Sequence, residues 1–99
     1  MKIEFAESAI CDLEDIKIYY DEQHVPDIGN NFILDIISHI EQLPNNPKIG
    51  RQVPEFCMSS IRELIHSPFR IVYVLNEISI QIIRAWRSER LMHLPLIIE

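Results

Sequence analysis

The stretch that most constrains the fold is residues 60–90, where extended structure is concentrated. Three runs within it are rich in β-branched and aromatic residues, which is the composition of strands. These runs are Ile61–Ile65, Phe69–Leu75 and Ile78–Trp86. Because only Asn76 and Glu77 separate the last two runs, we expect a hairpin between them. The C-terminal half therefore predicts a three-stranded block of sheet.

The N-terminal half has the periodicity of helices. Lys2–Phe5 alternates polar and apolar residues, which predicts a short first strand. Apolar residues then recur every three or four positions in a helix that we expect Ser8 to cap and that runs to about Glu22. A second helix is predicted to begin at Pro26, where the missing N–H is not needed, and to end at Pro44. Since the connection is short, the two helices should form an antiparallel hairpin.

Together these elements predict one α+β domain over residues 1–99, with the order β-α-α-β-β-β. Helices grouped before strands favour a two-helix antiparallel hairpin packed on one face of a mostly antiparallel sheet. The proline-rich segment Pro44–Met58 is predicted to be a loop, in which Gly50 supplies a positive φ. The apolar tail Leu91–Glu99 should dock on its own domain or bind another chain.

The net charge of −6 is unevenly distributed along the chain. Residues 1–47 are strongly acidic, whereas residues 48–99 carry most of the basic side chains. A protein that binds nucleic acid by charge alone would be basic overall. We therefore expect the two halves to present different faces to different partners.

The sequence predicts neither a cofactor nor a metal site. Cys11 and Cys57 share no close spacing, and no cluster of His, Cys or carboxylate side chains has the spacing of a zinc site. We expect both cysteines to be reduced and to act as small buried apolar residues. Because the N-terminus lacks the apolar core of a signal peptide and no run is long enough to span a membrane, we expect a cytoplasmic protein without membrane contacts.

All but one of the arginines of the chain fall in the predicted strands or just after them. They are Arg62, Arg70, Arg84, Arg87 and Arg90. A sheet built mostly of Ile and Val has no structural need for so many guanidinium groups. Each arginine must therefore reach solvent, pair with a carboxylate or meet a partner, and any single one is best explained by a salt bridge within the sheet.

Three local patterns point to a known family. Asp12–Ile16 shows a DL..I pattern in the first helix, and Gly50–Glu55 shows the pattern GR.VPE. Ile61–Ile65 followed by Phe69–Tyr73 shows IREL and then RI.Y. With the order of the elements, these patterns resemble the RelE/ParE superfamily, the toxins of type II toxin–antitoxin pairs. The resemblance implies a cognate antitoxin that wraps and silences the toxin in a hetero-oligomer.

The superfamily has two branches with different activities. RelE-like toxins are ribosome-dependent endoribonucleases that cut mRNA, whereas ParE-like toxins inhibit DNA gyrase without cleavage chemistry. Cleavage through the 2′-OH needs a base, an acid and cations on the phosphate. Arg62, Arg70 and Arg84 could supply the cations, and the proton carriers could be Glu55 or His93. His66 is a further candidate if the fold brings it to the arginines.

The ParE-like branch is favoured by what the end of the last predicted strand lacks. RelE-like enzymes commonly place Tyr or His there, but this chain has Ala85–Arg90 instead, and His93 lies beyond it. The lysines that would help grip ribosomal RNA are also scarce. We therefore expect a toxin that inhibits gyrase and growth. The alternatives are the mRNA endoribonuclease and an inactive module that only binds the antitoxin.

Trp86 and its arginine neighbours form the predicted target-binding site, which consists of Arg84, Trp86, Arg87 and Arg90. Trp and Arg are the residues most enriched at binding hot spots. The structural alternative for Trp86 is that it covers the end of the sheet. For the antitoxin, the helical hairpin, the sheet edge and the apolar tail are the candidate surfaces.

Overall fold

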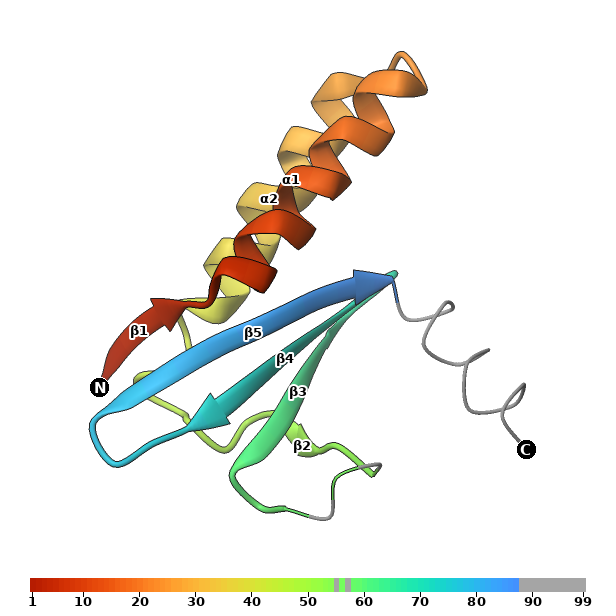
Figure 1. The fold of residues 1–99 in the computed structure, drawn as a ribbon. Helices are drawn as coiled ribbons and strands as arrows, with labels where there is room; N and C mark the ends of the chain where they lie inside the picture. The colour runs from red at the N-terminus through yellow and green to blue at the C-terminus, as the bar shows by residue number, and fades with distance from the viewer. Residues whose placement is uncertain (55, 57, 88–99) are drawn as a thin grey trace, which may run out of the picture.

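The chain was studied as a computed structural model, which describes residues 1–54, 56 and 58–87 (Figure 1). Its elements are β1 (Lys2–Phe5), α1 (Glu7–Glu22), α2 (Pro26–Ile40), β2 (Arg51–Gln52), β3 (Ile61–His66), β4 (Phe69–Leu75) and β5 (Ser79–Arg87). The predicted α+β fold, with a helical hairpin on a mostly antiparallel sheet, is confirmed. The two-residue strand β2 was not predicted, because it is too short to show a period of two.

The sheet has the strand order β1-β5-β4-β3-β2. β1 pairs in parallel with β5, and the other neighbours pair antiparallel. Figure 1 shows the two helices side by side over β5, with their connecting turn pointing away from the sheet. Gly29 allows the helices to approach closely, because a Cβ there would lie 2.8 Å from Cβ of Tyr20.

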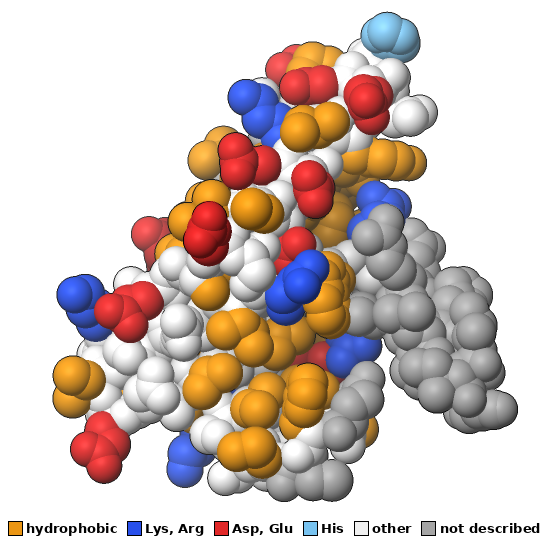
Figure 2. Space-filling model, in the orientation of Figure 1, with side chains coloured by type: hydrophobic (Ala, Val, Ile, Leu, Met, Phe, Trp, Pro, Cys, Tyr) orange, Lys and Arg blue, Asp and Glu red, His pale blue; other side chains and the backbone are white. Residues whose placement is uncertain are grey.

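The hydrophobic core lies between the helices and the sheet. Its largest buried side chains are Ile36, Ile40, Leu43, Phe69, Ile71, Tyr73, Ile80 and Ile82. Acidic side chains are spread over the exposed surface of the helical hairpin (Figure 2). The acidic residues of the N-terminal half therefore lie mainly on the helices, while the arginines among the described residues lie on the strands. Within the described residues, no helix is both long enough and apolar enough to span a membrane.

Two predicted helix boundaries need correction, whereas the predicted start of α2 at Pro26 is confirmed. α1 begins at Glu7 with Ala6 as N-cap, and no side chain caps it. Ser8 is not the cap, because its hydroxyl donates instead to the Ile83 carbonyl of β5, at 2.6 Å. α2 ends at Ile40, earlier than the predicted stop at Pro44, and hydrogen-bonded turns follow. A proline disfavours helical backbone in the residue before it, so the helix cannot continue up to Pro44.

Two residue-level expectations were wrong. Cys11 is exposed rather than buried, because α1 turns its neighbour Asp12 toward β5, and Cys57 lies outside the described residues. Gly50 does not have a positive φ. It is required because a Cβ would lie 2.6 Å from both the Glu63 carbonyl oxygen and the Tyr73 hydroxyl.

Candidate functional site

A β-bulge in β5 sets the direction of the side chains near its end. Val72 of β4 pairs with Arg84, but the next residue, Tyr73, pairs with Ile82. Ile83 is therefore an extra residue in β5, and the alternation of inward and outward side chains shifts by one position there.

The shift places the arginines of β5 on different faces of the sheet. Ile82 before the bulge and Ala85 after it are both buried against the helices. By alternation, Arg84 and Trp86 lie on the face away from the helices, and Arg87 lies on the helix side. Without the bulge these assignments would be reversed.

Side chains of α1 continue the hydrogen bonding of β5 where β1 stops. β1 ends at Phe5, opposite Ile82. One turn apart on α1, Ser8 donates to the Ile83 carbonyl and Asp12 accepts from the Ala85 N–H at 2.9 Å. These two side chains satisfy backbone groups of β5 that would otherwise lie on an open edge.

Asp12 also orients Arg84. The Arg84 Nε and Nη2 atoms donate to the two carboxylate oxygens of Asp12 at 2.8 and 3.0 Å, a bidentate ion pair. The guanidinium carbon lies 4.2 Å from the centre of the Trp86 ring. Although its charge is paired, the Arg84 side chain is 39% exposed, so the stacked pair of Arg84 and half-buried Trp86 is accessible to a partner.

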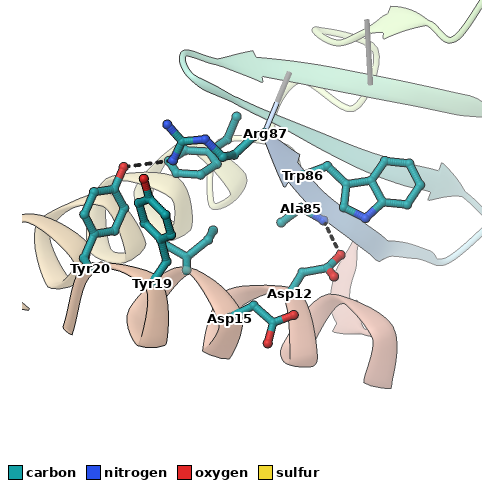
Figure 3. A pocket seen from close by; sticks show the side chains of 9 residues that line it. Asp12, Asp15, Tyr19, Tyr20, Ala85, Trp86 and Arg87 are labelled. Carbon is teal, nitrogen blue, oxygen red and sulfur yellow. Dashed lines mark hydrogen bonds between the residues drawn. The ribbon is translucent and has the colours of Figure 1, made fainter. Parts of the chain in front are cut away.

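A small cavity lies between α1 and the end of β5, with a volume of about 100 Å³ (Figure 3). Tyr19, Tyr20, Phe69 and Trp86 contribute aromatic rings to its wall. Arg87 also lines it: its Nη1 atom donates to the Tyr20 hydroxyl at 3.1 Å, and its guanidinium lies 5.3 Å from the Tyr19 ring centre. The cavity therefore combines apolar surface with an oriented cation, as in many protein-binding hot spots.

Arg70 has a structural partner in the sheet. Its side chain is 8% exposed, and its Nε atom donates to Oε1 of Glu63 at 2.7 Å, with a second contact from Nη2 to the same oxygen. Arg51 of β2 donates to the other oxygen of Glu63. One buried carboxylate thus holds two arginines on the face away from the helices.

Arg62 lies on the opposite face of the sheet, because it pairs in register with the core residue Tyr73. Its Nη1 donates to the Gly50 carbonyl at 2.9 Å and its Nε to the Ser59 carbonyl at 3.1 Å, so it holds the loop onto β3. Burial raises the pKa of the Tyr73 phenol, while the Gly50 N–H and the charge of Arg62 act in the opposite direction.

Comparison with known proteins places this arrangement in a family. The sequence profile described as "ParE toxin of type II toxin-antitoxin system, parDE" matches residues 3–92. The chain belongs to this family of type II toxins. The resemblance to the RelE/ParE superfamily is thereby confirmed. No curated protein matches the chain in sequence.

Two solved structures have the same fold as this ParE-family chain. One, the chromosomal ParDE system from P. aeruginosa, has a TM-score of 0.74 and 24% identity over 88% of this chain and 95% of that chain. The other, the YoeB dimer from Staphylococcus aureus, has a TM-score of 0.61 and 16% identity over 87% of this chain and 94% of that chain. At such identities the likeness concerns the fold alone.

The residues predicted for a ribonuclease are dispersed in this ParE-family fold. Arg70 and Arg84 share a face of the sheet, whereas Arg62 lies on the other face. Glu55 and His93 lie outside the described residues. His66 lies at the end of β3, where its ring contacts a histidine of α2 rather than one of the arginines.

The predicted target-binding residues are brought together in part. Arg84, Trp86 and Arg87 all lie at the end of β5, around Asp12 and the cavity, while Arg90 lies outside the described residues. Asp12 was quoted only as part of the DL..I pattern, and its role was missed. Arg84 and Asp12 lie 72 positions apart along the chain, so local periodicity could not reveal that they pair.

Proposed function

We propose that the chain is the toxin of a type II toxin–antitoxin pair, and that it inhibits DNA gyrase through the end of β5. The observation that carries this proposal is the Arg84–Trp86 stack, which Asp12 fixes and which lies half exposed beside the cavity that Arg87 lines. Preoriented Trp and Arg side chains suit a protein partner, because little side-chain freedom is lost when they bind.

A cleavage reaction has less support from the same residues. Bidentate pairing with Asp12 and burial with Glu63 already neutralise the charges of Arg84 and Arg70. Cations that must stabilise a phosphate transition state need to face the substrate. Arg62 bonds to backbone carbonyls on the other face of the sheet.

A cognate antitoxin is the second partner that we propose. α1 exposes Ile10, Ile18 and Tyr19, and Tyr19 also lines the cavity beside β5. An antitoxin segment that folds on binding could cover these apolar side chains and the Trp86 surface together. Such a segment would block the target-binding surface directly.

The test uses the purified protein in two parallel assays: supercoiling by gyrase, and cleavage of mRNA engaged by ribosomes. We expect supercoiling to stop at increasing concentrations of the protein while the message remains intact, and addition of the antitoxin to restore supercoiling. Normal supercoiling with a cut message would overturn the proposal in favour of the ribonuclease. Normal supercoiling, intact message and normal growth on expression would indicate an inactive antitoxin-binding module.

A further inference from the structure

Two histidines from distant parts of the chain meet outside the candidate site. His39 lies in the last turn of α2, and His66 is the last residue of β3. Their Nδ1 atoms are 3.1 Å apart, their ring centres are 5.2 Å apart, and both rings are partly buried. The contact therefore joins the C-terminal end of α2 to the sheet.

The number of protons on the pair decides whether this contact can exist. When both rings are neutral, one Nδ1–H donates to the lone pair of the other Nδ1. One added proton leaves an imidazolium that donates to a neutral ring, so the contact persists and is strengthened by charge. A second proton removes the last lone pair and places two positive charges within hydrogen-bonding distance, so the rings must separate.

The surroundings do not offset that second charge. Among the charged side chains on the elements nearest the pair are Asp35 of α2, Glu41 just after α2, Lys48, Arg51 of β2, Arg62 and Glu63 of β3, Arg70 of β4 and Arg87 of β5. In the described part of the chain, neither ring is ion-paired with any of these carboxylates, and Glu63 is already bound by two arginines. The negative end of the α2 dipole favours a cation at His39, yet the pKa of this ring is lowered.

We propose that the pair His39–His66 is an acid-sensitive latch, which releases the end of α2 and the segment 41–50 from the sheet when both rings are protonated. The segment has further anchors: Leu43 is buried in the core, the Tyr73 hydroxyl donates to the Pro47 carbonyl and accepts from the Gly50 N–H, and Arg62 donates to the Gly50 carbonyl. The histidine pair adds the contact between the end of α2 and the end of β3. Opening would thus loosen the loop that leads into β2. This inference is independent of the proposed target.

Protonation of His39 is disfavoured in the folded protein. Burial, and next the charge of His66, lower the pKa of His39 below its usual value of 6.5. The unfolded chain therefore binds more protons than the folded chain between the lowered pKa and 6.5. The stabilising effect of the neutral ring is complete above pH 6.5 and is lost as the pH falls through the lowered pKa.

The test follows imidazole signals by NMR from pH 8 to pH 5, together with amide hydrogen exchange expressed as protection factors. We expect the pair to titrate in two separate steps. As the pH falls from 6.5 toward the second step, protection of the Leu43 and Gly50 amides should fall by up to about tenfold for each pH unit, while the Ile71 amide in β4 stays protected. In His66→Gln the pKa of His39 should rise toward its usual value.

His39→Gln should abolish the acid-dependent loss of protection, because no second charge can form. His24→Asn is the matched control: it removes an exposed imidazole from the turn between the helices, and Asn tolerates the φ of 63° at that position. This control should behave as the wild type. The latch is refuted if the wild-type segment keeps its protection at pH 5, or if His39→Gln loses protection as the wild type does.

Discussion

Glu63 shows how one residue can decide the role of several others. It is the most buried carboxylate among the described residues, with 1% of its surface exposed, and it accepts hydrogen bonds from Arg51 and Arg70. A buried carboxylate of this kind is stable only while its partners remain. The positive charge of Arg70 therefore has a structural role: it pairs with Glu63 inside the sheet.

Glu63→Gln should lower the free energy of unfolding by about 3–5 kcal/mol, because it removes the negative charge that Glu63 places against the buried Arg70. Urea denaturation at neutral pH measures the effect. Glu77→Gln is the control, since Glu77 is exposed in the turn between β4 and β5, and it should change stability by less than about 0.5 kcal/mol. Equal stability of the two variants would show that the Glu63 network does not hold the sheet.

At the scale of elements, side chains of α1 supply the hydrogen-bonding partners along the last part of β5 that a neighbouring strand would otherwise supply. β1 covers β5 only as far as Ile82, and beyond it Ser8 and Asp12 bind the backbone groups that β1 does not pair. The helix also places Tyr19 and Tyr20 against Arg87. The orientation of the β5 side chains therefore depends on the contact between α1 and the sheet.

Asp12→Ala should destabilise the protein by about 1–3 kcal/mol, because the buried Ala85 N–H loses its acceptor and Arg84 loses its partner. Exchange of the Ala85 amide should accelerate more than exchange elsewhere in β5. Asp15→Ala is the matched control: it is the same substitution on the same helix, at an exposed residue. If both variants unfold at the same urea concentration, Asp12 does not secure the strand.

At the scale of the whole molecule, the order of the elements and the layered fold were predictable from the sequence. Periods of two and of about 3.6 residues indicated the strands and helices, and Pro26 and the Asn76–Glu77 turn placed boundaries. The strand order, the bulge at Ile83 and strand β2 were not predictable, because they depend on contacts between distant segments. For the same reason the sequence located the arginine cluster but not the partner of each arginine.

The distribution of charge also belongs to this scale. Acidic side chains are spread over the helical hairpin (Figure 2). Arg84, Trp86 and Arg87 lie at the end of β5. The central claim is that this end of the strand is the surface that binds gyrase. Replacing Trp86 tests this surface most directly, because truncation of a Trp at a hot spot costs about 2 kcal/mol or more of binding free energy.

The most direct measurement is the concentration of Trp86→Ala that inhibits gyrase supercoiling by half, compared with wild type and Ile78→Ala. Ile78 is the matched control, because it is a large apolar residue, 80% exposed, next to the opposite end of β5. With folding verified by urea denaturation, we expect Trp86→Ala to need at least about tenfold more protein and Ile78→Ala to match wild type. Half-inhibition by Trp86→Ala at the wild-type concentration would contradict the claim.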